Sequence, residues 1–170
     1  KLVQRNILHN ILEEKRLSQH AKAYQKNVSL IDNAMPHINK KLILKLDIKD
    51  FFDNITFNMV YDSCFREELY PKSIGILLTK LCTYHGHLPQ GAPTSSYISN
   101  IVMREFDEVV GKYCSNNSIS YTRYSDDLTF SGDFNVTSVI NMVKEELKKY
   151  GFKLNYKKIH VIRNNKRQLV

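Results

Sequence analysis

Apolar residues recur every three or four positions in several parts of the chain, beginning with Val3, Ile7, Leu8 and Ile11. This spacing places them on one side of a helix and predicts helices with one buried face. We expect helices over residues 3–12, 20–26, 56–69, 71–81, 94–109 and 139–150. Gly151 follows the last of these ranges, where a glycine commonly ends a helix.

Other segments alternate apolar and polar residues or are short apolar runs, which predicts strands. We expect strands over residues 42–48, 119–124, 128–130, 152–155 and 159–163. In the first of them, Leu42, Leu44, Leu46 and Ile48 share one side, and the intervening residues, which end at Asp47, share the other. The strand is thus expected to be half-buried, with Asp47 near its end and away from the leucine side.

The order of these elements is strand, helices, hairpin, helix and strands, which favours an α+β fold. Such an order suits an antiparallel sheet with helices on one face, the split βαβ arrangement. The chain has 170 residues, of which 42% are hydrophobic, with only 6 Gly and 4 Pro. This composition predicts a folded chain without long linkers.

Basic residues outnumber acidic ones, with 25 Lys and Arg against 17 Asp and Glu, and the formal net charge is +8. A positive field favours a polyanionic partner such as nucleic acid or an anionic membrane. No segment approaches the roughly 20 apolar residues that a membrane-spanning helix needs, so we expect no membrane partner. Cys64, Cys82 and Cys114 lack zinc-ligand spacing, which indicates a reduced, cytoplasmic protein. His85 and His87 are interpreted as parts of an ordinary loop.

Two adjacent acids, Asp126 and Asp127, lie at the predicted turn between two apolar strands. Two like charges are costly there unless a cation neutralises them, although a solvent-exposed turn is the alternative interpretation. Asp47 ends a separate strand that would lie beside this hairpin, so we expect three carboxylates to converge. Two Mg²⁺ ions about 4 Å apart, held by such oxygen ligands, activate a 3′-hydroxyl and stabilise the leaving pyrophosphate. The three acids therefore predict nucleotidyl transfer.

Four segments resemble the palm motifs of reverse transcriptases and occur in the order of that family. They are LDIKDFF at residues 46–52, LPQGAPTS at 88–95, YSDD at 124–127, and GFKLN at 151–155 with Lys158. The resemblance implies a polymerase right-hand palm and an RNA-directed DNA polymerase. Its partners would be an RNA template, an RNA/DNA primer duplex and dNTPs.

The resemblance also implies roles at the metal site, which would hold two Mg²⁺ ions, with Mn²⁺ as the alternative. Asp47 and Asp126 match the two acids that hold both ions, and Asp127 matches the adjacent third acid. Ile48 matches a residue whose backbone carbonyl is also a ligand. Lys158 matches a lysine that neutralises or protonates the departing pyrophosphate; simple solvated charge is its alternative.

Five further positions match residues that bind the incoming nucleotide. Phe52 matches the aromatic gate that stacks under the sugar and excludes a 2′-hydroxyl, and without its motif it would be interpreted as a core residue. Asp50 and Phe51 match positions whose backbone N–H groups face the triphosphate. Gln90 matches a nucleotide contact, and Gly91 lets the backbone come close.

A shorter element resembles the Asn-Ala-x-x-His signature of bacterial retron reverse transcriptases, with Asn33, Ala34 and His37 at its fixed positions. Asn33 would hold a loop through its amide, and His37 would contact nucleic acid or bond a backbone carbonyl. In the YSDD box, Tyr124 matches the family and Ser125 replaces the usual alanine of retron enzymes. The subfamily implies a cognate structured non-coding RNA, msDNA synthesis primed from a 2′-hydroxyl, and antiphage defence with an effector protein.

We expect residues 1–40 to form part of the fingers, and residues 41–170 to form the palm, with fingers-side helices inserted at about 57–95. Leu169 and Val170 resemble the start of the Val-Thr-Gly element of retron enzymes, so the thumb is expected to be absent.

Three other functions compete with the interpretation as a retron reverse transcriptase. A viral RNA-dependent RNA polymerase usually has a second Asp where Phe52 stands and a Gly where Ser125 stands, and both positions argue against it. A group II intron or other defence-associated reverse transcriptase differs here only in the element from Asn33 to His37. An inactive nucleic-acid-binding palm is disfavoured because all three acids are intact.

Overall fold

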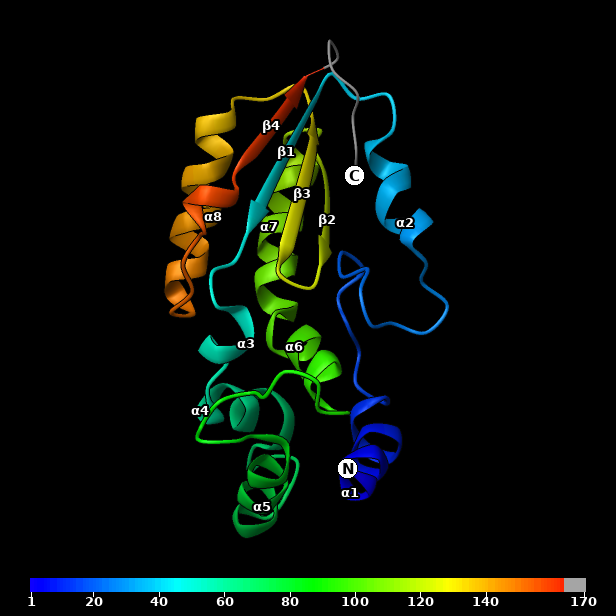
Figure 1. Ribbon diagram of the computed structural model, residues 1–170, viewed down its shortest axis with the longest axis vertical. Coiled ribbons are helices and arrows are strands. Elements are labelled where there is room, and N and C mark those ends of the chain that lie inside the picture. The colour runs from blue at the N-terminus through cyan, green and yellow to red at the C-terminus, as the bar shows by residue number, and fades with distance from the viewer. Residues whose placement is uncertain (164–170) are drawn as a thin grey trace. The chain divides into compact units, whose positions relative to one another are not determined.

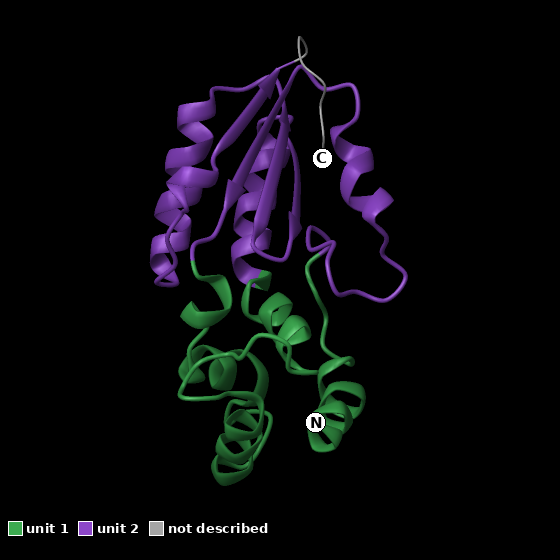
Figure 2. Cartoon of the chain, viewed as in Figure 1, with its two compact units in different colours: residues 1–18, 50–104 green, residues 19–49, 105–170 purple. Residues whose placement is uncertain are grey.

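The structure is a computed structural model and describes residues 1–163, which form two compact units (Figure 2). Unit 1 holds residues 1–18 and 50–104, and unit 2 holds residues 19–49 together with the chain from residue 105 onward. The expected end of the palm at residues 164–170, including Leu169 and Val170, lies outside the described residues. The division into fingers and palm stays a prediction.

Unit 2 is built on a four-stranded antiparallel sheet (Figure 1). Its strands are β1 (Leu42–Asp47), β2 (Ser120–Tyr124), β3 (Asp127–Gly132) and β4 (His160–Arg163). They lie in the order β2-β3-β1-β4, so the two strands that come first and last in the chain are neighbours. This order confirms the predicted α+β fold with a split βαβ sheet.

The two sides of the sheet differ in chemistry because directly paired residues of antiparallel strands share a side. On the first side, Leu44 and Leu46 of β1 pair with Phe130 and Leu128 of β3, and all four are buried. On the second side, Asp47 pairs with Asp127, as the predicted alternation requires. The expected half-burial of β1 is wrong, since Ile43 on the second side is also inaccessible. Strand β1 is thus an inner strand, between β3 and β4, that is largely buried on both sides.

The helical elements of unit 2 follow from local capping and packing signals. They are α2 (Leu30–Ala34), the 3₁₀ turn η2 (Met35–His37), α7 (Arg104–Asn116, whose first residue is the last of unit 1), α8 (Val136–Lys149) and the 3₁₀ turn η4 (Tyr156–Lys158). Ser29 and Asp32 form a capping box at the start of α2, and the Asn135 side chain caps α8. Helix α7 lies against the leucine side of the sheet, where Asp107 bonds Tyr121 and Arg123 of β2 (Figure 1).

Unit 1 is helical. Its elements are α1 (Leu2–Ile7), the π turn η1 (Leu8–Leu12), α3 (Phe51–Asn54), α4 (Phe57–Val60), the π turn η3 (Tyr61–Phe65), α5 (Lys72–Cys82) and α6 (Ser95–Val102). The Thr56 hydroxyl accepts a hydrogen bond from the Met59 N–H, so Thr56 caps a helix as predicted. None of the described helices is both long and apolar enough to cross a membrane.

Several predicted elements differ from the structure. Residues 20–26 are not helical, because their backbone bonds strand β2 instead: the Arg123 N–H donates to the His20 carbonyl at 2.8 Å, and the Lys22 N–H donates to the Arg123 carbonyl at 2.7 Å. Residues 152–155 form only an isolated bridge between Leu154 and Ile48. The helix expected over 94–109 is interrupted at Met103, and α7 then continues to Asn116. Helices α2 and α3 were not predicted.

Candidate active site

The three predicted metal-binding acids lie at one end of the sheet of unit 2. Asp47 is the last residue of β1 and is the direct cross-strand partner of Asp127, the first residue of β3. Beyond this pair, the Ile48 N–H donates to the carbonyl of Asp126 at 3.0 Å. The strand register therefore brings together Asp47, Ile48, Asp126 and Asp127, which are up to 80 positions apart in the sequence.

Lys158 reaches the same end of the sheet through a backbone connection. The Asn155 N–H donates to the carbonyl of Asp47 at 2.8 Å, and the 3₁₀ turn η4 follows directly. The Lys158 Nζ atom then donates to Asp47 Oδ2 at 2.7 Å, and the Asp47 side chain is only 5% exposed. The hydrogen bond and charge of Asp47, with the charges of Asp126 and Asp127, raise the pKa of Lys158. Its ammonium therefore remains a cation in contact with the predicted ligands.

Burial and the neighbouring acids both affect the pKa of Asp127. Partial burial first, and then the negative charge of Asp126 with a smaller effect of Asp47, raise the pKa of Asp127, while Lys45 and Lys158 oppose the rise. Such a site gains from an added cation, and carboxylate oxygens are the ligands that Mg²⁺ and Mn²⁺ prefer. The donor set thus fits a divalent ion. Within residues 1–163, however, no three His, Cys, Asp or Glu side chains are already grouped as a metal site, so the two ions stay a prediction.

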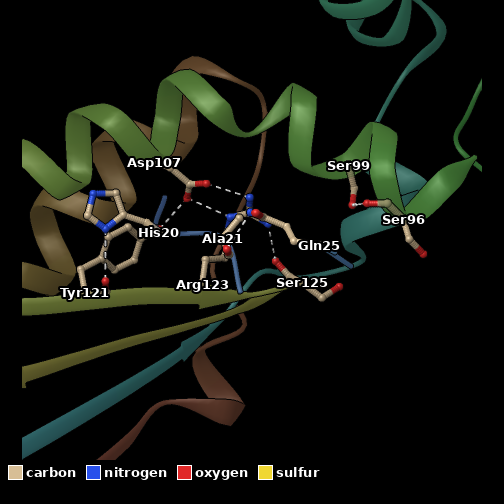
Figure 3. A network of polar contacts seen from close by, with 9 residues as sticks. All are labelled: His20, Ala21, Gln25, Ser96, Ser99, Asp107, Tyr121, Arg123 and Ser125. Carbon is tan, nitrogen blue, oxygen red and sulfur yellow. Dashed lines mark hydrogen bonds and ion pairs between the residues drawn. The ribbon is translucent and has the colours of Figure 1, made fainter. Parts of the chain in front are cut away.

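The turn that carries the acid pair is held from inside the unit (Figure 3). Ser125 has a φ of 60°, a left-handed conformation that costs a non-glycine residue roughly 1–2 kcal/mol. The Ser125 carbonyl accepts a hydrogen bond of 3.0 Å from Nη1 of Arg123, whose side chain is completely buried. Arg123 in turn forms an ion pair with Asp107 of α7. Neither Arg123 nor Asp107 is predicted as a site residue from the sequence.

His37 corrects both roles that the sequence suggested for it. Its ring is buried and forms hydrogen bonds with Thr122 Oγ1 of β2 at 2.9 Å and with Ser131 Oγ of β3 at 2.7 Å. It therefore contacts two side-chain hydroxyls, neither a backbone carbonyl nor the surface where nucleic acid would bind. Burial first, and then the charge of Lys40, lower the pKa of His37 to about 4, so the ring is neutral at pH 7.

The rest of the Asn-Ala-x-x-His element is helical. Asn33 and Ala34 lie in the short helix α2, which begins at the Ser29–Asp32 capping box, and the contact of the Asn33 amide with a loop stays a prediction. The Asn33 Oδ1 atom is buried and has no hydrogen-bond partner among the described residues. The element thus attaches to the sheet through His37.

The predicted nucleotide-binding residues belong to unit 1. Asp50 has a φ of 48° and is the N-cap of α3, which carries Phe51 and Phe52. Phe51 is buried, Phe52 is partly exposed, and their rings meet edge to face with centroids 5.3 Å apart. Phe52 is therefore not a fully buried core residue, which keeps it available as a gate.

The second nucleotide-binding segment is joined to the first within unit 1. The Leu88 N–H donates to the carbonyl of Ile55 at 2.9 Å, directly after α3 and directly before the turn that carries Gln90. Gln90 is exposed, and Gly91 has a φ of +78°, which favours glycine. A Cβ on Gly91 would meet no atom within 4 Å, so the backbone here is open to a ligand.

The structure agrees with a purely structural role for the three cysteines and for His85 and His87. Cys64, Cys82 and Cys114 are buried and free, and burial raises their pKa values to about 12, 11 and 12. They are small core residues without thiolate character. His85 and His87 are exposed residues of a tight turn. In this turn the Tyr84 N–H donates to the His87 carbonyl, and the His87 N–H donates to the Tyr84 carbonyl.

Comparison with known families decides the classification. A family model described as reverse transcriptase (RNA-dependent DNA polymerase) matches residues 1–169. The chain belongs to the reverse transcriptase family. Membership agrees with the order of the four motifs and with the split βαβ sheet.

Curated relatives of this reverse transcriptase chain include several retron enzymes. It is 38% identical over 131 residues to the Retron Ec86 reverse transcriptase of Escherichia coli, covering 77% of this chain and 41% of the relative. It is 34% identical over 157 residues to the Retron Ec83 reverse transcriptase of Escherichia coli, covering 87% and 50%. With the Retron Mx65 reverse transcriptase of Myxococcus xanthus it shares 32% identity over 190 residues, covering 100% and 44%. The retron resemblance is thereby confirmed, and the chain spans half or less of the length of these relatives.

Solved structures extend the comparison of the fold to distant proteins. Apo telomerase from Candida tropicalis aligns with a TM-score of 0.59 at 13% identity, covering 99% of this chain and 40% of that one. Telomerase from Candida albicans, in complex with a fragment of telomeric RNA, aligns with a TM-score of 0.59 at 13% identity, covering 98% and 35%. At this identity the likeness concerns the fold alone, and it agrees with a palm.

Proposed function

We propose that this chain is the palm, with part of the fingers, of a retron-type RNA-directed DNA polymerase that transfers dNTPs to a primer hydroxyl on an RNA template. The observation that carries the proposal is the register at the end of the sheet, where Asp47 pairs with Asp127 and Asp126 bonds Ile48. This register supports the proposal because it makes acidic residues from two strands and a hairpin turn neighbours at one end of the sheet, with Lys158 bonded to Asp47. Family membership supports the same reaction.

In this proposal, Asp47, Asp126 and Asp127, with the backbone carbonyl of Ile48, hold two Mg²⁺ ions or Mn²⁺ in their place. The bound ions would activate the primer hydroxyl and stabilise the leaving pyrophosphate. The Lys158 ammonium donates a hydrogen bond to the Asp47 carboxylate. The same ammonium is then available to neutralise pyrophosphate.

Unit 1 supplies the nucleotide-binding part of the proposal. The N–H groups of Asp50 and Phe51 face the triphosphate, and Phe52 lies under the sugar and excludes ribonucleotides. Gln90 contacts the nucleotide, and the open backbone at Gly91 permits close approach. The left-handed Asp50 supports this assignment, because such strained residues cluster at ligand sites.

The retron assignment adds partners. We propose a cognate structured RNA as template and primer, a branched product, an effector protein, a role in antiphage defence and a cytoplasmic location. Identities of 32–38% to retron enzymes support this class over a group II intron enzyme. The net charge of +8 is consistent with an RNA partner.

The test is RNA-templated incorporation of dNTPs by the full-length protein with Mg²⁺, comparing the wild type with Asp126→Asn. This substitution keeps the side-chain volume and removes the charge, and we expect incorporation to fall at least about 1,000-fold, in line with roughly 4 kcal/mol of lost transition-state stabilisation. Asp133→Asn is the matched control, because Asp133 is exposed and forms its ion pair with the exposed Lys41. Activity of Asp126→Asn equal to that of the control would refute the metal assignment.

A further inference from the structure

Arg123 is an unusual residue for the inside of a sheet. It is the fourth of the five residues of strand β2, and both its side chain and that of Asp107 are 0% exposed. Burying a guanidinium is costly unless a carboxylate and further acceptors surround it. Nε donates to Asp107 Oδ1 and Nη2 donates to Asp107 Oδ2, both at 2.8 Å, so the pair is bidentate.

Asp107 is itself held in place by a neighbour of Arg123 on the same side of β2. The Tyr121 hydroxyl donates to Asp107 Oδ1 at 2.8 Å. Burial, and then the charge of Asp107, hold the pKa of Tyr121 well above its usual value, so the hydroxyl remains a donor. The Asp107 carboxylate thus accepts hydrogen bonds from the Tyr121 hydroxyl and from two nitrogens of Arg123. The two bonds to Arg123 hold the plane of the guanidinium group in one orientation.

The third nitrogen of the guanidinium group, Nη1, points along the strand toward the turn at Ser125 (Figure 3). Nη1 donates to the carbonyl of Ser125 at 3.0 Å. Ser125 is left-handed and comes directly before Asp126, whose own carbonyl accepts the Ile48 N–H. The guanidinium therefore contacts the backbone of the turn that carries Asp126 and Asp127.

Stability alone does not account for this arrangement, because an apolar set of similar volume commonly stabilises a core as well as a buried ion pair does. What an apolar set cannot supply is a donor fixed in direction toward the Ser125 carbonyl. We infer that Arg123, oriented by Asp107 and Tyr121, is a positioning residue that holds the Ser125–Asp127 turn in its metal-binding geometry. The inference rests on the proposed role of the acids as metal ligands.

The test measures Mn²⁺ binding to the full-length protein by electron paramagnetic resonance, together with the urea unfolding midpoint. Arg123→Lys keeps the charge but loses the planar fork, and the triple variant R123M/D107M/Y121F replaces the whole buried set with apolar groups. We expect both to bind Mn²⁺ about 10- to 100-fold more weakly, the usual effect of removing an outer partner of a metal ligand. Lys41→Met, which removes an exposed ion pair with Asp133, is the control and should bind as the wild type does.

The triple variant separates positioning from folding, because removing all three polar groups together leaves neither member of the Arg123–Asp107 pair as an unpaired buried charge. An unfolding midpoint near that of the wild type with weakened Mn²⁺ binding would support the inference. Wild-type Mn²⁺ affinity in either folded variant would overturn it. Asp126→Asn distinguishes the failure of the two proposals. If Asp126→Asn binds Mn²⁺ as the wild type does, the metal assignment fails. If Asp126→Asn loses Mn²⁺ binding while the Arg123 variants keep it, only the role of Arg123 is refuted.

Discussion

Acidification should destabilise unit 2 through His37. The ring is buried between Thr122 and Ser131, and its pKa is about 4 in the folded chain against an ordinary value of 6.5. Between these two pH values the unfolded chain binds a proton that the folded chain excludes, so stability falls as pH decreases. Above pH 6.5 both states are neutral at this site and the contribution is complete.

The size of the effect follows from the difference in pKa. From pH 6.5 to pH 5 the loss is about 2 kcal/mol, and by pH 4 it reaches about 3 kcal/mol, at about 1.4 kcal/mol for each pH unit. Urea unfolding at pH 7, 6 and 5 measures it in the wild type and in His37→Gln. Glutamine cannot titrate, so His37→Gln should be less stable than the wild type at pH 7 but should lose about 2 kcal/mol less on acidification.

All other titrating groups are common to the two proteins, so the difference between their pH profiles isolates this ring. His160→Gln is the control, because His160 lies in the same sheet but is exposed, and its profile should follow that of the wild type. Parallel profiles for the wild type and His37→Gln would refute the burial of a neutral His37.

Two further predictions concern Phe52 and Gly111. Phe52→Ala should raise incorporation of ribonucleotides relative to deoxynucleotides in the full-length protein, measured as the ratio of their kcat/KM values; an unchanged ratio would exclude the gate. Gly111→Ala should lower the free energy of unfolding by roughly 1 kcal/mol, because the added methyl collides with the His20 ring and overpacking outweighs the better helix propensity of alanine. In a His20→Ala background the same change should stabilise the chain, and continued destabilisation there would contradict the collision.

The parts of the site that the sequence predicts correctly depend on local periodicity. Alternation along β1 places Leu44 and Leu46 on one side and Asp47 on the other, and the strand pairing confirms this. The hairpin could be predicted because two apolar runs flank a short polar turn. Once β1 and β3 are neighbours, the proximity of Asp47 to Asp127 follows from register alone.

Features set by contacts between distant segments could not be predicted. The sequence predicts a helix over residues 20–26 after a possible cap at Ser18, but the His20 carbonyl and the Lys22 N–H bond Arg123 of the edge strand β2. The sequence predicts a strand after Gly151. In the structure, the Asn155 N–H donates to the Asp47 carbonyl, and a 3₁₀ turn follows directly. His37 and Arg123 carry no local signal of burial, because histidine and arginine are usually exposed residues.

These distant contacts have a common consequence for the catalytic hairpin. Strand β2 is an edge strand of the sheet and would otherwise be held only by β3. Residues 20–22 bond its outer edge, His37 bonds Thr122 from one side of the sheet, and Asp107 binds Arg123 from the other. A strand fixed along its edge and on both sides has little freedom to shift in register. Because a shift of one residue would turn Asp127 to the opposite side from Asp47, we argue that this polar framework preserves the pairing of the two acids on which the proposed chemistry depends.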